Sequence, residues 1–182
     1  MGILGIVLTV VMAAAVIFYW EFIQGLGAYG YLGAFIISLF GGATVIAPIP
    51  MTPVIFALGR ILTPWFVGVA AGLGETLGGL AIYMTGYGGG TAFVKSKHGK
   101  IQAIYSRLAG WMERRGSLTL FILSATVNPF FYPAGLAAGA LRFGVWKYTL
   151  ICLVGKIIKG WTVAFAGYWG LRELMRILGM PV

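Results

Sequence analysis

Residues 46–53 read Ile46-Ala47-Pro48-Ile49-Pro50-Met51-Thr52-Pro53, a proline-rich stretch inside an otherwise apolar run. Each proline removes a backbone donor and clashes with the preceding turn, so no continuous helix passes through this stretch. Apolar residues flank it on both sides, from Leu32 to Phe40 and from Val54 to Leu58. Broken backbone at membrane depth persists only where it is buried in protein or lines a cavity. The stretch therefore predicts a break of functional importance inside a membrane segment.

The composition predicts an integral membrane protein. Of the 182 residues, 60% are hydrophobic and 9% are charged, and the mean hydropathy is +0.95, whereas a soluble domain has roughly 25% charged residues. The net charge of +9 is better explained by topology signals and anionic lipid than by nucleic acid. The few acids, the single His98 and the single Cys152 form no metal-site or triad pattern, so we expect no enzymatic activity, metal or cofactor.

We predict a single all-α polytopic membrane domain over residues 1–182. Its parts are a first span at 1–20, a first repeat at 32–86, a basic amphipathic linker helix at 95–116, a second repeat at 117–170 and a tail at 171–182. The runs Trp65–Gly86 and Val145–Gly170 have membrane-spanning length, and Gly88–Gly90 is expected to end the first. The apolar stretch before each run is too short for two crossings of about 20 residues each. It is predicted to return as a re-entrant hairpin or to cross once as a broken helix.

The second half of the chain repeats the first. The motif Ala43-Thr44-Val45 recurs as Ala125-Thr126-Val127, Gly59 answers Gly139, and Trp65 answers Trp146. The prolines predicted at the two hairpin tips are Pro48, Pro50, Pro53, Pro129 and Pro133. If each hairpin is re-entrant, each unit crosses the membrane once and the units are inverted relative to each other, as in many secondary transporters. If each hairpin crosses fully, the units are parallel.

The distribution of basic residues favours the inverted arrangement. On that arrangement one side of the membrane carries Lys95, Lys97, Lys100, Arg107, Arg114, Arg115, Arg142 and Lys147. The other side carries Arg60, Arg172 and Arg176. The positive-inside rule then places the more basic side in the cytoplasm. Within the amphipathic helix, Lys97, Lys100, Arg107 and Arg114 either contact anionic lipid headgroups or serve only as topology signals.

Two residues of opposite charge occupy the same position in the two repeats. Glu75 follows Trp65, and Lys156 follows Trp146, by ten residues, which is roughly 15 Å into each span at 1.5 Å per residue. An ion facing lipid at that depth costs about 3 kcal/mol or more, so each is predicted to be the partner of the other. The pair is either a structural link or part of a substrate or proton pathway. Lys159 has no further acid to pair with, which makes it a candidate for an anionic ligand such as a phosphate unless it snorkels.

Two polar residues fall at the tip of the second hairpin. Asn128 precedes a proline and either donates to a ligand or satisfies freed carbonyl groups. Tyr132 either hydrogen-bonds at the same tip or is an ordinary interfacial or core tyrosine. The predicted substrate or ion pathway therefore consists of Glu75, Lys156, Lys159, Asn128 and Tyr132.

These motifs resemble the DedA/VTT (SNARE-associated Golgi protein) superfamily over roughly Ser38–Gly170. The resemblance rests on Pro48-Ile49-Pro50, on the glycine-acid stretch Gly72–Gly79, and on Asn128-Pro129 with the later glycine at position 139. It implies two facing re-entrant hairpins and the movement of phospholipids or lipid phosphates across a bilayer. It also implies, in some members, coupling to protons or sodium, and it places the membrane acid of the family at Glu75.

The chain departs from the family pattern at two places. Thr126 and Tyr132 stand where many bacterial members have arginines around the second-hairpin proline, and no acid lies between Glu21 and Glu75. Lys156 and Lys159 are candidates to supply the missing positive charge.

We expect a protein of the inner (plasma) membrane of a prokaryote that moves a lipid or lipid phosphate through a groove between two hairpins. One alternative is a small-ion or solute transporter of the same fold. Another is a non-transporting scaffold in which the Glu75–Lys156 pair is structural. The expected partners are anionic or phosphate-bearing lipids and a coupling proton or cation. The sequence leaves open whether the chain forms a homo-oligomer.

Overall fold

The protein is helical throughout the part of the chain that the structure describes. The computed structural model describes residues 29–43, 51–94 and 99–177. Its helices are α3 (Tyr29–Ala43), α4 (Met51–Ile61), α5 (Pro64–Val94), α6 (Gly99–Ala125), α7 (Phe131–Ala140) and α8 (Val145–Ile177). The predicted first span at 1–20, and Pro48 and Pro50 of the first tip, lie outside the described residues.

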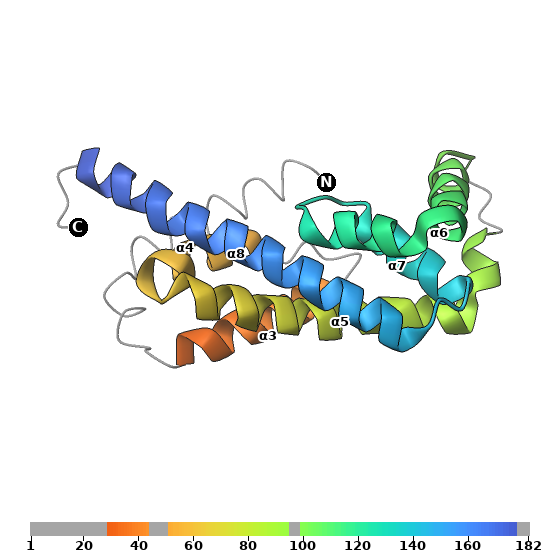
Figure 1. The fold of residues 1–182 in the computed structure, drawn as a ribbon, viewed down its shortest axis with the longest axis horizontal. Helices are drawn as coiled ribbons and strands as arrows, with labels where there is room; N and C mark the ends of the chain where they lie inside the picture. The colour runs from red at the N-terminus through yellow and green to blue at the C-terminus, as the bar shows by residue number, and fades with distance from the viewer. Residues whose placement is uncertain (1–28, 44–50, 95–98, 178–182) are drawn as a thin grey trace.

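Two long helices, α5 and α8, form the centre of the molecule and run antiparallel along it (Figure 1). Toward one end, the indole Nε1 of Trp161 donates to the carbonyl oxygen of Trp65 at 2.9 Å. Further along, the Tyr148 hydroxyl donates to the carbonyl oxygen of Gly79 at 3.1 Å. Small residues let the two backbones approach, because a Cβ on Gly160 would lie 2.5 Å from the carbonyl oxygen of Gly68.

These two helices are long and apolar enough to cross a bilayer. The apolar segments are Pro64–Gly88 and Val145–Gly170, and both carry exposed aromatic side chains near their ends. On α5 these are Trp65 and Tyr87, and on α8 they are Trp146 and Trp169. At 1.5 Å per residue, each pair is separated by about 33–35 Å, which matches a hydrocarbon core of about 30 Å with aromatic residues at both interfaces.

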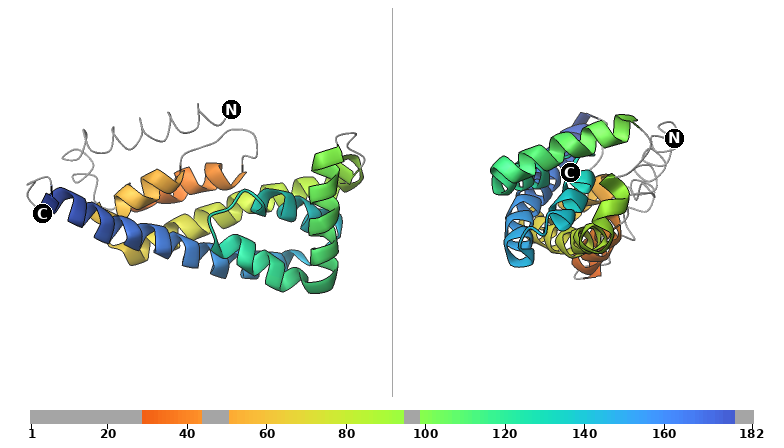
Figure 2. Two further views of the ribbon diagram at one scale, coloured as in Figure 1. Left: turned by 90° about the horizontal axis from the view of Figure 1, so that it is seen from above. Right: turned by 90° about the vertical axis from the view of Figure 1, so that its right-hand side faces the viewer.

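Two helical hairpins flank the central pair. The first consists of α3 and α4, and the second consists of the end of α6 and α7 (Figure 2). Helix α6 is kinked at Arg115, which has φ −144° and ψ 47°. The kink separates an arm at 99–114 that crosses one end of the bundle from an arm at 116–125 that runs along it (Figure 2). It lies at the boundary predicted between the linker helix and the second repeat.

The second hairpin is interrupted where its proline predicts, whereas residues 44–50 of the first lie outside the described part of the chain. Helix α3 ends at Ala43 and α6 ends at Ala125, the equivalent residue of the second repeat. Pro129 lies in the turn after α6, but Pro53 and Pro133 do not lie in loops. Each is the third residue of its helix, α4 or α7, where the missing N–H would have had no acceptor within the helix. These two prolines therefore start helices.

The second helix of each hairpin packs against the central helix of the other repeat. Helix α4 contacts α8, and α7 contacts α5. A Cβ on Gly59 of α4 would overlap the backbone of Ala164, and a Cβ on Gly139 of α7 would overlap the backbone of Tyr83. The two repeats are thus interlocked through glycines at equivalent positions.

The two long helices extend beyond the predicted spans. The apolar segments end at Gly88 and Gly170, but α5 continues through Gly88–Gly90 to Val94 and α8 continues to Ile177. A glycine inside a helix costs only about 1 kcal/mol relative to alanine. Glycines therefore weaken a long helix without ending it, unless a competing turn is available.

Candidate functional site

The two central helices bring three charged side chains together at mid-length. Lys156 Nζ lies 2.7 Å from Glu75 Oε1, and Lys159 Nζ lies 2.5 Å from the same oxygen. The Lys156 and Glu75 side chains are 1% and 8% exposed, and the Lys159 side chain is 12% exposed. The predicted pairing of Glu75 with Lys156 is confirmed. We call these three residues the charge cluster.

The expectation that Lys159 lacks an acidic partner is wrong, because it shares the Glu75 carboxylate with Lys156. Residues three apart in a helix lie on the same face, so Lys156 and Lys159 both point toward α5. That spacing was visible in the sequence and could have predicted the shared partner. The charge cluster consequently carries two cations for one carboxylate.

The end of α3 in the first hairpin and the start of α7 in the second meet at the charge cluster. Lys156 Nζ lies 3.7 Å from the centroid of the Phe131 ring, at the start of α7, in a cation–π contact. Near the end of α3, a Cβ on Gly42 would lie 2.6 Å from the carbonyl oxygen of Glu75. The Tyr132 hydroxyl joins the tips directly by donating to the carbonyl oxygen of Gly41 at 2.6 Å. The contact of Phe131 with Lys156 was not predicted, because the only signal in the sequence was the position of Phe131 beside the second tip.

Asn128 is occupied by its own hairpin. Its Nδ2 donates to the carbonyl oxygens of Leu123 at 2.9 Å and Thr126 at 3.1 Å, and to the Thr126 hydroxyl at 2.7 Å. Its Oδ1 accepts from the backbone N–H groups of Phe130 and Phe131 at 2.9 and 3.1 Å. The side chain therefore satisfies backbone groups freed by the break and caps α7, which is the second of its two predicted uses.

Of the four basic residues predicted to contact lipid headgroups, the two whose side chains the structure describes are not brought to the charge cluster. Arg107 and Arg114 lie exposed on the arm of α6 that crosses the end of the bundle. Lys97 lies outside the described residues, as does the side chain of Lys100. The structure thus separates a buried charged centre from a basic end.

Acidic, histidine and cysteine side chains form no group of three that could hold a metal ion within residues 29–43, 51–94 and 99–177. Cys152 is buried as a free thiol on α8. The chemistry that the described residues offer at the centre is therefore ion pairing and hydrogen bonding.

A family comparison identifies the family of the chain. The model of the VTT domain matches residues 49–169, about two thirds of the chain, including α5, most of α8 and the charge cluster. The chain belongs to the VTT domain (DedA/SNARE-associated) family. No curated protein and no solved structure matches it.

Membership assigns the chain to a broad class. VTT domain proteins form a family of membrane proteins of transporter type. The two long apolar helices, with exposed aromatic residues at both ends, agree with that class. The chain is accordingly a membrane protein whose central charges lie inside the matched region.

Proposed function

We propose that this VTT domain protein moves a lipid or lipid phosphate across the bilayer, along a path between its two hairpins. The observation that carries the proposal is the charge cluster, in which Lys156 and Lys159 share one carboxylate where the hairpin tips meet. Polar and charged groups inside the membrane are costly and generally mark substrate or ion pathways.

The charges of the cluster do not balance. With all three groups ionised, Glu75 cancels one lysine and leaves a net charge of +1 among buried and part-buried side chains. An uncompensated charge in a low-dielectric interior is unfavourable by several kcal/mol. A phosphate headgroup arriving between the tips would neutralise the surplus, and Lys159, the most exposed of the three, is placed to meet it first. Glu75 would then gate the path or couple it to a proton or cation.

The proposal includes re-entrant hairpins. In the second hairpin, which the structure describes from the kink of α6 to the start of α8, α7 contains 10 residues, or about 15 Å at 1.5 Å per residue. Neither α7 nor the equally short arm at 116–125 reaches the ~30 Å of a hydrocarbon core. That tip would therefore turn back within the membrane, at the depth of the charge cluster, and we propose the same for the equivalent first tip.

The proposal also includes an inverted repeat. It is supported by the antiparallel course of α5 and α8, which carry the sequence-equivalent residues Glu75 and Lys156. Equivalent glycines at 59 and 139 make equivalent contacts with the opposite repeat. On this arrangement Arg107, Arg114 and Arg142 face the cytoplasm of a prokaryotic cell by the positive-inside rule.

Reconstitution tests the proposal. Purified protein is placed in liposomes with a fluorescent phosphatidylglycerol, and a membrane-impermeant quencher is added outside. The rate at which inner-leaflet lipid moves to the outer leaflet and is quenched there is measured. We expect the rate to rise with protein and to fall at least tenfold in Lys159→Gln, while Lys147→Gln, an exposed lysine outside the cluster, stays close to the wild type. If folded protein moves no phosphate-bearing lipid, the proposed function is contradicted.

A structural scaffold is the second candidate, and specific contacts favour it. Asn128 and Tyr132 already donate to carbonyl groups of the chain, and Lys156 is enclosed by Glu75 and Phe131. A scaffold predicts that the exchange Glu75→Lys with Lys156→Glu restores stability and every biological activity of the protein. A transporter predicts restored stability with impaired movement of lipid, because the exchanged charges face different hairpins.

A further inference from the structure

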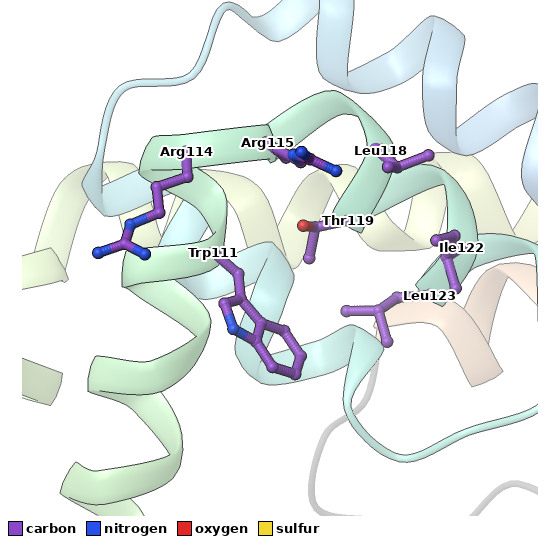
Figure 3. Close-up of a pocket in the computed structure, with 7 residues that line it drawn as sticks. All are labelled: Trp111, Arg114, Arg115, Leu118, Thr119, Ile122 and Leu123. Atoms are coloured by element: carbon purple, nitrogen blue, oxygen red, sulfur yellow. The ribbon is translucent and has the colours of Figure 1, made fainter.

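A groove lies on α6 at its kink, away from the charge cluster (Figure 3). It has a volume of about 300 Å³, which is at the lower end of the range for small-molecule sites. Trp111 forms one wall, and Leu118, Ile122 and Leu123 of the arm at 116–125 form the other. The groove thus lies in the angle between the two arms of α6.

The kink creates the groove and places charge at its rim. The non-helical backbone of Arg115 turns the helix, so the Trp111 side of the first arm faces the second arm across a gap. Arg114 and Arg115 lie at the turn. Figure 3 shows Arg115 extending along the rim toward Leu118, Arg114 extending in the opposite direction, and Thr119 pointing into the space. The end of the groove at the turn is therefore cationic, and the rest is apolar apart from the Thr119 hydroxyl.

The surroundings indicate what occupies it. Leu118 and Ile122 are about half exposed, although the opposite face of the same arm buries Leu120 and Ser124 against the bundle. In a membrane protein, exposed apolar side chains on such an arm face acyl chains. The end of the bundle carries further exposed basic residues, Arg107, Arg142 and Lys147, and the indole of Trp111 suits the boundary between headgroups and hydrocarbon.

We propose that this groove binds one anionic phospholipid, with its phosphate at Arg114 and Arg115 and an acyl chain along Trp111, Leu118 and Ile122. Arginine forms bidentate hydrogen bonds with phosphate, and the apolar walls match a hydrocarbon chain. The site is separate from the path between the hairpins. The proposal of this site depends on the position of the groove in a membrane protein, and it applies whether or not the chain moves lipid.

The test is photo-crosslinking in liposomes. The protein is reconstituted with a trace of phosphatidylglycerol carrying a diazirine on its acyl chain, or with the matching phosphatidylcholine, and labelled peptides are mapped by mass spectrometry. We expect residues 111–123 to be labelled preferentially by phosphatidylglycerol. Each arginine near an anionic lipid contributes about a fivefold preference, so the double variant Arg114→Gln with Arg115→Gln should lose most of it.

Two further variants separate the site from general attraction. Thr119→Phe fills the groove and keeps both arginines, so labelling of 111–123 should fall severalfold. Arg142→Gln removes a charge from the same end outside the groove and should leave labelling unchanged. Equal labelling by both lipids, or full labelling in Thr119→Phe that elutes and melts like the wild type, would overturn the proposal. Lys159→Gln, which is expected to slow lipid movement, should keep the labelling of 111–123, so the two proposals can fail independently.

Discussion

At the scale of single residues, the shared carboxylate of Glu75 is the feature on which most of the charged interior depends. Two ammonium groups within 2.7 Å of one oxygen are tolerable only while that oxygen is negative. Lys156 is the more dependent of the two lysines, because its side chain is 1% exposed and Lys159 retains 12%. Lysine has a long flexible stem, so Lys159 can move toward water or a ligand more readily.

Glu75→Gln should therefore destabilise the protein strongly. It leaves two cations without a countercharge, and removing one partner of a buried pair costs about 3–5 kcal/mol. Lys159→Gln should cost much less, because the Lys156 pair survives and part of Lys159 is exposed. Thermal unfolding in detergent measures both, with Lys147→Gln as the exposed control. Equal melting temperatures for Glu75→Gln and the wild type would show that the cluster is not buried as described.

A second residue-scale feature is Arg142, a non-glycine residue with φ of 52° in the turn between α7 and α8. The left-handed conformation costs an L-residue about 1–2 kcal/mol relative to glycine. The guanidinium also lies 5.4 Å from the centroid of the Tyr87 ring, a contact that any truncation removes.

Comparing Arg142→Gly with Arg142→Ala isolates the backbone conformation, because both variants lose the cation–π contact. We expect the glycine variant to unfold at a higher temperature than the alanine variant, by the equivalent of about 1 kcal/mol. Alanine equal to or better than glycine would mean that the turn does not hold the left-handed conformation in the membrane.

At the scale of helices, close contact through glycine joins the two repeats. Helix α7 approaches α5 at Gly139 so closely that a Cβ would overlap the backbone of Tyr83 and Gly86. Backbone cannot be displaced as a flexible side chain can, so a larger residue there must push the helices apart.

Gly139→Ala should therefore destabilise the protein, and Gly33→Ala should not. Gly33 lies inside α3 with no atom within 4 Å of its would-be Cβ, so alanine there gains up to about 1 kcal/mol of helix propensity. Unfolding of the two variants by denaturant under identical detergent conditions makes the comparison. A stabilising Gly139→Ala would contradict the packing of α7 on α5.

The sequence predicts where the helices lie better than it predicts which helices pack together. The positions of α5 and α8 follow from proline-free apolar runs, and the break after Ala125 follows from Pro129, which cannot continue a helix. The pairing of Glu75 with Lys156 follows from equal depth and opposite charge. By contrast, Gly59 and Gly139 indicate a close approach between helices but do not indicate which helix is approached. The packing of α4 against α8 and of α7 against α5 was therefore not predictable from the sequence. The groove at Arg115 depends on a kink that no proline marks.

At the scale of the whole molecule, the antiparallel course of α5 and α8 has a consequence for orientation. The turn between α4 and α5 and the equivalent turn between α7 and α8 precede helices that run antiparallel (Figure 1). If both long helices cross the bilayer, these two turns lie on opposite sides of it. Full crossing by the hairpins would instead require α4 and α7 to be about twice their observed lengths.

Thr63→Cys and Gly144→Cys should accordingly react with a membrane-impermeant maleimide from opposite sides of the membrane. Both positions are exposed, one in each turn, whereas the native Cys152 is buried and supplies a low background. In intact cells and in inverted vesicles, we expect Gly144→Cys to label only from the cytoplasmic face, where Arg142 and Lys147 lie, because basic residues are retained on that side. Thr63→Cys should label only from the outer face. Labelling of both cysteines from one face would require parallel repeats and would remove the basis for a path between two opposed hairpins.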